Sequence, residues 1–252
     1  MNGSADAFAH WSVGIVVPAR NEQSRIQRCL DSVLEAAAAS GAERAFVVVV
    51  ADCCTDRTVS LAERTLGSRG RVIECDAAAP GTARRLGVDA VLAELRTVPR
   101  SRLWLANTDA DSYVPTDWIH RQLQMADDGA TAIAGIVAVD SFAAHGVAGA
   151  ATFAHHYVLN ADGTHPHVHG ANIGVRADVY LDAGGWRDIA VGEDHCLWQR
   201  VQSCGWPVRS STASIVTTSG RLRGRARGGF ADTLRARLRA RSAALPAEGI
   251  TT

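Results

Sequence analysis

Two carboxylates stand one residue apart in the segment 108–111 (Thr-Asp-Ala-Asp), directly after the apolar run 103–106 (Leu-Trp-Leu-Ala). An apolar run of this length predicts a buried strand, so both carboxylates should lie at the carboxyl end of a sheet, where open α/β folds bind ligands. Carboxylate oxygens suit a divalent cation that carries a phosphate. An acidic turn after a strand is also common, so the meaning of Asp109 and Asp111 depends on the rest of the chain.

Three further polar segments stand at comparable places. The segment 18–22 (Pro-Ala-Arg-Asn-Glu) follows the apolar run 13–17, and the segment 51–58 follows the run 46–50. The segment 192–194 (Gly-Glu-Asp) precedes a predicted helix, where two acids are also favoured by the helix dipole. Asp52 and Asp56 have an ordinary explanation as turn or capping residues.

Strand and helix patterns alternate through the first half of the chain. Apolar runs predict buried parallel strands at 13–17, 46–50, 71–75 and 103–106. Helical patterns fill the intervals at 22–40, 55–66, 82–95 and 115–126. This alternation predicts an α/β fold with a doubly wound, mostly parallel sheet and helices on both faces. The glycine fingerprint of a dinucleotide-binding domain does not follow the first run.

The second half is less regular. It predicts strands at 130–139 and 168–175, helices at 147–159 and 193–202, and a polar loop at 210–227. His165, His167 and His169 alternate, so a strand would place all three on one face. Such a face could bind a metal or an acceptor, although a hydrogen-bonded strand face is the more ordinary interpretation. Contact with an acceptor is favoured over metal binding.

Composition excludes several classes of function. The 252 residues, 47% of them hydrophobic, can bury a full core. The 26 basic and 26 acidic residues cancel, which argues against a nucleic acid partner. Every basic residue is arginine, so neither a P-loop lysine nor a Schiff-base lysine is available. The six cysteines form no C-x-x-C pair, which argues against a zinc ribbon or a disulfide scaffold.

Location is predicted from what the sequence lacks. No apolar run reaches the roughly 18 to 20 residues of a membrane-spanning helix, and residues 1–11 do not resemble a secretion signal. We therefore expect a cytoplasmic protein. The segment 221–241 carries eight arginines against one acid, Asp232. The segment could lie on anionic lipid at the inner membrane surface, bind phosphate, or pack as a terminal helix whose arginines are exposed to solvent.

Taken in order, the four polar segments resemble family 2 glycosyltransferases of the GT-A fold, over residues 13–205. The resemblance implies one domain: a nucleotide-sugar-binding half at about 11–112, an acceptor and catalytic half at about 113–218, and a basic C-terminal segment at about 219–252. It also implies a UDP- or GDP-linked sugar donor, Mn²⁺ or Mg²⁺ as cofactor, and transfer of one sugar with inversion. The polymer-forming Q-x-x-R-W motif is missing, because Val201 follows Gln199-Arg200.

The resemblance also implies roles for individual residues. On the nucleotide side it places Pro18, Ala19 and Glu22 at the pocket floor, Asp52 at the base, and Asp109 at the ribose, and it counts Arg20 among the nucleotide-sugar-binding residues. Arg84 falls in a segment that lies near the donor, although Arg85 replaces the asparagine that usually follows, which leaves open which arginine faces the donor. Asp111 would bind the metal and Asp194 would be the catalytic base. The acceptor-side candidates are His169, Asn172 and Glu193.

The chemistry of transfer is consistent with these roles. A divalent ion held by one or two carboxylates stabilises a departing diphosphate, and a second carboxylate takes the proton of the attacking hydroxyl. Two alternatives remain open: a nucleotidyltransferase and a non-catalytic nucleotide-sugar-binding module. The acceptor is also open between a lipid-linked molecule and a phosphorylated small metabolite.

Overall fold

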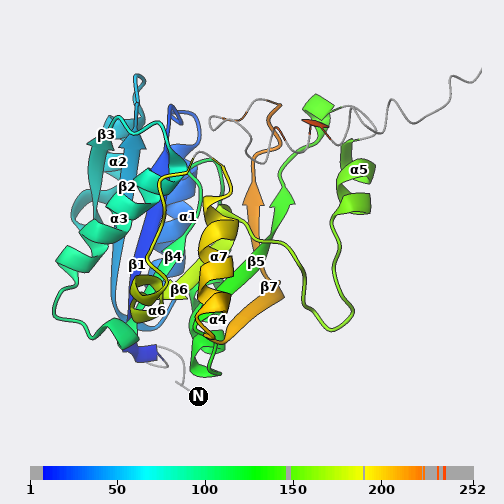
Figure 1. The fold of residues 1–252 in the computed structure, drawn as a ribbon. Helices are drawn as coiled ribbons and strands as arrows, with labels where there is room; N and C mark the ends of the chain where they lie inside the picture. Colours follow the sequence, from blue (N-terminus) through cyan, green and yellow to red (C-terminus); the bar gives the residue numbers. More distant parts are fainter. Residues whose placement is uncertain are drawn as a thin grey trace, which may run out of the picture.

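The computed structural model describes residues 8–145, 149–189, 191–222, 224, 232 and 235–236. A seven-stranded sheet forms its centre (Figure 1). In spatial order its strands are β3 (Gly70–Cys75), β2 (Ala42–Asp52), β1 (Phe8–Ala19), β4 (Leu103–Asn107), β6 (Ile173–Arg176), β5 (Ala132–Val139) and β7 (Val208–Thr218). Only β6 runs against its neighbours, and the other paired strands are parallel. The predicted mostly parallel sheet is confirmed.

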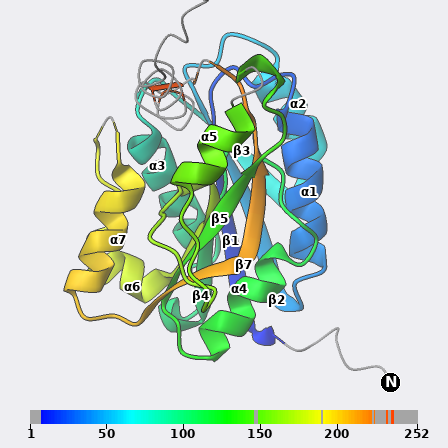
Figure 2. The same ribbon diagram turned by 90° about the vertical axis from the view of Figure 1, so that its right-hand side faces the viewer.

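Helices cover both faces of the sheet (Figure 2). One face carries α1 (Ile26–Ala38), α2 (Thr58–Leu66) and α4 (Trp118–Asp127), and the other carries α3 (Pro80–Glu94), α6 (Ala177–Asp182) and α7 (Glu193–Ser203). Ile26, Leu30 and Val33 recur at helical spacing, so α1 turns one continuous apolar stripe onto the sheet. The helix α5 (Gly149–His156) lies beside the β5–β7 end of the sheet. Among the described residues, no helix combines the length and apolarity needed to cross a membrane.

The first polar segment begins inside a strand, whereas the sequence placed it after one. Pro18 pairs with Val50 near the end of β1. A proline is tolerated there because β4 pairs with β1 only as far as Val16, whose carbonyl accepts from Thr108 N–H at 3.2 Å. The backbone nitrogen of Pro18, two residues later, points to the same side as the carbonyl of Val16, but beyond the end of β4. The hydrogen bond that proline cannot donate is therefore not required.

Two predictions for the second half are wrong. The predicted polar loop at 210–227 contains most of strand β7, which pairs in parallel with β5. Its serines and threonines hide the alternation of a strand, yet Ser214, Val216 and Thr218 are buried on one face. The predicted strand at 168–175 begins only at Ile173, after a 3₁₀ turn at Gly170–Asn172. Most of the arginine-rich segment lies outside the described residues, so its predicted membrane contact stays a prediction.

Candidate active site

The polar segments meet at one edge of the sheet. The parallel strands β1, β2 and β4 all end at this edge, and the antiparallel β6 begins there. Ion pairs and hydrogen bonds of the described residues link the segments to one another. Arg221 bridges Glu22 and Asp111, Arg84 bridges Asp109 and Glu193, and Gly170 binds Asp194. Residues from both halves of the chain therefore form one continuous polar site.

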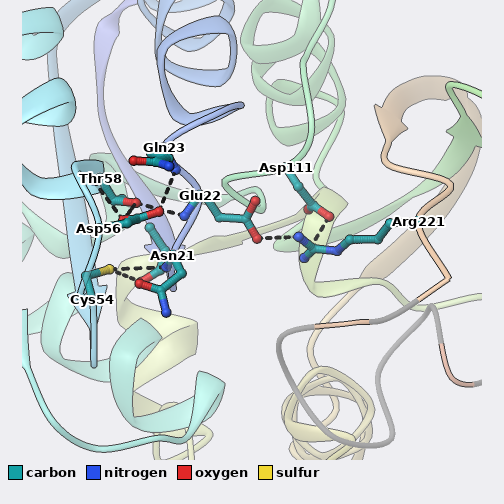
Figure 3. A network of polar contacts seen from close by, with 9 residues as sticks. Asn21, Glu22, Gln23, Cys54, Asp56, Thr58, Asp111 and Arg221 are labelled. Atoms are coloured by element: carbon teal, nitrogen blue, oxygen red, sulfur yellow. Dashed lines mark hydrogen bonds and ion pairs between the residues drawn. The ribbon is translucent and has the colours of Figure 1, made fainter.

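The loop after β1 is held by the loop after β2 (Figure 3). Glu22 N–H donates to Thr58 Oγ1 at 2.8 Å, and Asn21 Oδ1 accepts from Thr55 N–H at 2.8 Å. Asn21 has a φ of 53°, a left-handed conformation that asparagine tolerates better than most residues. Asp56 Oδ1 accepts from Thr58 N–H at 2.9 Å, which closes a turn just before α2. These contacts fix the buried Glu22 at the edge of the sheet.

Asp52 is oriented by groups that the sequence did not connect with it. Its Oδ1 accepts from Ala78 N–H at 2.8 Å, from the Cys53 thiol at 3.3 Å and from the Cys75 thiol at 3.6 Å. Desolvation, and next to it Asp52 itself, raise the pKa of both thiols, so they stay protonated donors. Oδ2 accepts no hydrogen bond from the described residues. One carboxylate oxygen is thus fully occupied and the other is left to contact a ligand.

Asp111 lies in a desolvated, negatively charged environment. Its side chain is 12% exposed, and Oδ2 contacts Arg221 Nη2 at 3.0 Å. Burial is the main cause that raises the pKa of Asp111 to about 7; Arg221 opposes the rise, and Asp109 and Glu22 add to it. A cation would relieve this repulsion. Because the described residues contain no group of three or more histidine, cysteine, aspartate or glutamate side chains arranged to hold a metal, water and phosphate oxygens would complete the coordination.

Arg84 is the arginine that faces the site. Its Nη2 donates to Asp109 Oδ1 at 2.6 Å, its Nε lies 3.5 Å from Glu193 Oε1, and its side chain is 3% exposed. Arg85 instead points outward, at 45% exposure, and pairs with Asp89 on the same helix. Arg84 therefore joins α3, the loop after β4 and the start of α7.

Asp194 is held by two backbone donors. Its Oδ2 accepts from Gly170 N–H at 2.9 Å, and its Oδ1 accepts from His195 N–H at 2.8 Å. Gly192, with a φ of 79°, turns the chain into α7 just before it, so the carboxylate lies at the N-terminus of this helix. The preceding Glu193 is buried against Arg84 and not turned towards a free surface. Desolvation raises the pKa of Glu193.

The three alternating histidines share one face, as predicted, but on irregular backbone. His167 stacks on Tyr157 with ring centroids 4.1 Å apart, and His165 and His169 lie 5.9 and 6.0 Å from His167. His165 Nε2 contacts Ala134 O at 3.1 Å, and His167 Nε2 contacts the carbonyl of Val158 at 2.9 Å. Both bonds give Nε2 the proton, so these two histidines do not offer that nitrogen to a metal.

His169 is a neutral hydrogen-bond acceptor at Nε2. Tyr157 Oη accepts from Val137 N–H at 2.7 Å, so its hydrogen is directed at His169 Nε2, 3.0 Å away. Burial, and then the charge of neighbouring histidines, lower the pKa of His169 to about 3. The role of Tyr157 was not predicted, because nothing in a predicted helix at 147–159 indicates that this tyrosine contacts His169.

Asn172, predicted on the acceptor side, is used inside the fold. Its Nδ2 donates to Ile136 O at 2.8 Å and to Ser214 O at 3.0 Å, and its Oδ1 accepts from Trp118 Nε1 at 2.9 Å. It is 1% exposed. These bonds join β5, β7 and α4, and they speak against a contact between Asn172 and an acceptor.

Comparisons with known proteins agree with this arrangement. A family model described as glycosyl transferase family 2 matches residues 14–181. No curated protein matches the sequence significantly. Among solved structures, the mannosyltransferase PcManGT from Pyrobaculum calidifontis in complex with GDP-Man and Mn²⁺ has a TM-score of 0.60 and 20% identity, over 84% of this chain and 58% of that one.

Two other structures extend the likeness. TarS 1-349 from S. aureus in complex with UDP-GlcNAc has a TM-score of 0.60 and 13% identity, over 87% of this chain and 61% of that one. GalNAc-T7 with UDP, GalNAc and Mn²⁺ has a TM-score of 0.62 and 14% identity, over 85% of this chain and 45% of that one. The chain thus spans less than two thirds of each of these structures. At such identities the likeness concerns the fold, which is the GT-A fold.

The family match covers well over half of the 252 residues and includes three of the four polar segments that meet at the edge of the sheet. The chain therefore belongs to glycosyl transferase family 2.

Proposed function

We propose that this chain transfers one sugar from a nucleotide-diphosphate sugar to an acceptor hydroxyl, with help from a divalent cation. One observation carries the proposal. Asp52, Asp109, Asp111 and Asp194 come from three separate segments and converge at one edge of the sheet, in a chain of this family. Base, ribose, diphosphate and acceptor would then be contacted in that order across the site.

Asp111 would hold Mn²⁺ or Mg²⁺ together with oxygens of the diphosphate, and the nearby Glu22 and Asp109 would add negative charge that attracts the cation. Bound there, the cation would neutralise charge on the departing diphosphate. The ligand chemistry fits such an ion, because carboxylate and phosphate oxygens are hard ligands and because burial disfavours an Asp111 carboxylate without a compensating cation. Two of the solved structures named above contain Mn²⁺, which supports this choice of ion.

Asp194 would accept the proton of the attacking hydroxyl. Gly170 N–H and the N-terminus of α7 hold its carboxylate in place, so it meets the acceptor already oriented. Neutral His169, one residue before Gly170, lies beside this position and can hydrogen-bond an acceptor group. Attack on the face opposite the diphosphate would invert the anomeric configuration, as expected for this family.

The geometry of Asp52 favours uracil over guanine. Guanine presents two adjacent donors, N1–H and N2–H, which a carboxylate pairs with by using both oxygens. Asp52 Oδ1 already accepts three hydrogen bonds, so only Oδ2 is available. Uracil presents a single imino N–H and needs only one oxygen. We therefore expect the donor to be a UDP-sugar.

Nucleotide binding and slow donor hydrolysis test the proposal without knowledge of the acceptor. Calorimetry should show binding of UDP that depends on Mn²⁺, is lost in Asp111→Ala and is retained in Asp194→Asn. Hydrolysis of the UDP-sugar that binds should fall by about 10²- to 10⁴-fold in Asp194→Asn, the usual contribution of a general base. Release of pyrophosphate would instead indicate a nucleotidyltransferase. Full activity of Asp194→Asn would remove it as the base.

A further inference from the structure

Arg221 places a positive charge on Asp111, the carboxylate that we assign to the metal, and on the neighbouring Glu22. Figure 3 shows its guanidinium between Glu22 and Asp111. Nη1 lies 2.5 Å from Glu22 Oε1, and Nη2 lies 3.0 Å from Asp111 Oδ2. The side chain is 20% exposed, so it is partly accessible to solvent. A cation that lies three residues beyond the end of β7 thus joins the loop after β1 to the loop after β4.

The backbone makes this contact a built feature of the fold. Tyr113, two residues beyond Asp111, exchanges backbone hydrogen bonds of 2.8 and 3.0 Å with Thr217 near the end of β7. Gly220 N–H donates to Asp140 Oδ1 at 2.8 Å, and Gly220 O accepts from His145 Nε2 at 2.7 Å. The residue before Arg221 is therefore anchored on both sides. The long side chain of Arg221 can turn while its backbone stays in place.

A metal ion and this guanidinium compete for the same charge. Asp111 Oδ2 cannot pair fully with Arg221 and with a divalent ion, because two cations on one buried carboxylate repel each other strongly at low dielectric constant. A metal that binds Asp111 would therefore turn the guanidinium away. An arginine fork matches phosphate oxygens geometrically, and the chain has no lysine to serve in its place.

We propose that Arg221 is a donor-binding residue with two positions: it neutralises Glu22 and Asp111 before the metal binds, and it contacts the diphosphate of the donor afterwards. The inference rests on the proposed function, since it requires a diphosphate at this edge. It adds a residue outside the segment that the family match covers. It also makes opposite predictions for binding of the metal alone and of the nucleotide.

Arg221→Met tests both positions, with Arg209→Met as the control, because Arg209 is an exposed arginine of β7 that pairs with Asp128. Free Mn²⁺ is measured by electron paramagnetic resonance. Arg221→Met should bind Mn²⁺ about tenfold more tightly than wild type, the size expected when a competing charge-assisted hydrogen bond is removed. A poorly folded variant would bind less Mn²⁺, so the direction of the change separates competition from misfolding.

Calorimetry at saturating Mn²⁺ then tests the second position. Arg221→Met should bind UDP about tenfold more weakly, whereas UMP, which has no β-phosphate, should bind nearly as it does to wild type. Arg221→Lys keeps the charge without the fork, so its Mn²⁺ affinity should stay near wild type and its UDP affinity should fall between the other two. Arg209→Met should match wild type throughout.

The outcomes separate this inference from the proposed function. Wild-type protein that binds neither UDP nor GDP with Mn²⁺ would overturn both. Wild-type protein that binds UDP with Mn²⁺, beside an Arg221→Met variant with unchanged Mn²⁺ and UDP affinities, would overturn only the role of Arg221. Each measurement on Arg221→Met also decides one part of the inference. An unchanged Mn²⁺ affinity rejects competition between Arg221 and the metal, and an unchanged UDP affinity rejects the contact between Arg221 and the diphosphate.

Discussion

Replacing Arg84 by methionine should destabilise the fold strongly. Arg84 is 3% exposed and compensates two carboxylates, Asp109 at 2.6 Å and Glu193 at 3.5 Å. Methionine fills a similar volume but carries no charge, so Glu193 would remain buried without a partner cation. Removal of one member of a buried ion pair costs about 3 to 5 kcal/mol, because the remaining charge is no longer compensated.

The structure places the expected loss at the lower end of that range. Asp109 is 37% exposed, so water can replace part of its contact with Arg84. Glu193 can relieve its own burial by taking up a proton, since its pKa is already raised by desolvation. We therefore expect a loss of about 3 kcal/mol. At about 2 to 4 °C per kcal/mol for a domain of this size, the melting temperature should fall by about 6 to 12 °C.

The neighbouring arginine supplies the control. Arg85→Met removes the same group from the same helix, but its pair with Asp89 is exposed and should contribute less than about 0.5 kcal/mol. Urea unfolding followed by circular dichroism at neutral pH gives both free energies. Adding Glu193→Gln to Arg84→Met should recover part of the loss, because it removes the uncompensated charge. Equal losses in Arg84→Met and Arg85→Met would refute the reasoning.

Three further predictions concern the acceptor side of the site and the choice of nucleotide base. Because the folded state holds the pKa of His169 near 3, below its ordinary 6.5, stability should be complete above pH 6.5 and fall as the pH drops, by up to about 1.4 kcal/mol per unit. Urea unfolding at pH 7.5 and 5.5 should show a smaller loss in His169→Gln, and an equal loss would contradict this origin. Gly170→Ala would press a methyl group against the Arg84 guanidinium, so we expect a cost of about 1 to 3 kcal/mol in thermal unfolding; an unchanged melting temperature would show that Arg84 can move aside. Cys75→Ala frees acceptor capacity on Asp52 Oδ1, so calorimetry should show GDP gaining affinity relative to UDP, and an unchanged ratio would argue against our explanation of base choice.

The sequence predicted the elements whose signals are local. Continuous apolar runs marked β1, β2, β3 and β4, and helical spacing marked α1, α2, α3 and α4, because in these elements burial follows the chain's own periodicity. Three of the four polar segments could be placed at one edge because parallel strands all end on the same side of a sheet, whereas the segment 192–194 was placed only by the family resemblance. Strand β7 escaped prediction because its buried face is partly serine and threonine, which are also the residues of loops.

The contacts that tune the site could not be predicted, because each joins residues far apart in the chain. Arg221 was only one of many C-terminal arginines until the fold placed it on Glu22. Tyr157 and the Cys75 thiol contact His169 and Asp52 through side-chain geometry that leaves no periodic trace. Arg221, Tyr157 and Cys75 contact the site residues and orient their side chains, whereas the motif residues indicate only the kind of chemistry.

Charge balance explains why the site needs two different arginines. Among the described residues, the four acids Glu22, Asp109, Asp111 and Glu193 form ion pairs with only two guanidiniums, those of Arg84 and Arg221, and a nucleotide diphosphate would add more negative charge. Arg84 is buried between two elements, so it balances the charge of Asp109 and Glu193 but has no room to change position when a ligand binds. Arg221 is partly exposed and extends from an anchored backbone, so its side chain can change position when a ligand binds. Under the proposed function, a donor would become electrostatically acceptable only when a divalent cation binds and Arg221 leaves Asp111, and metal and nucleotide binding would then depend on each other.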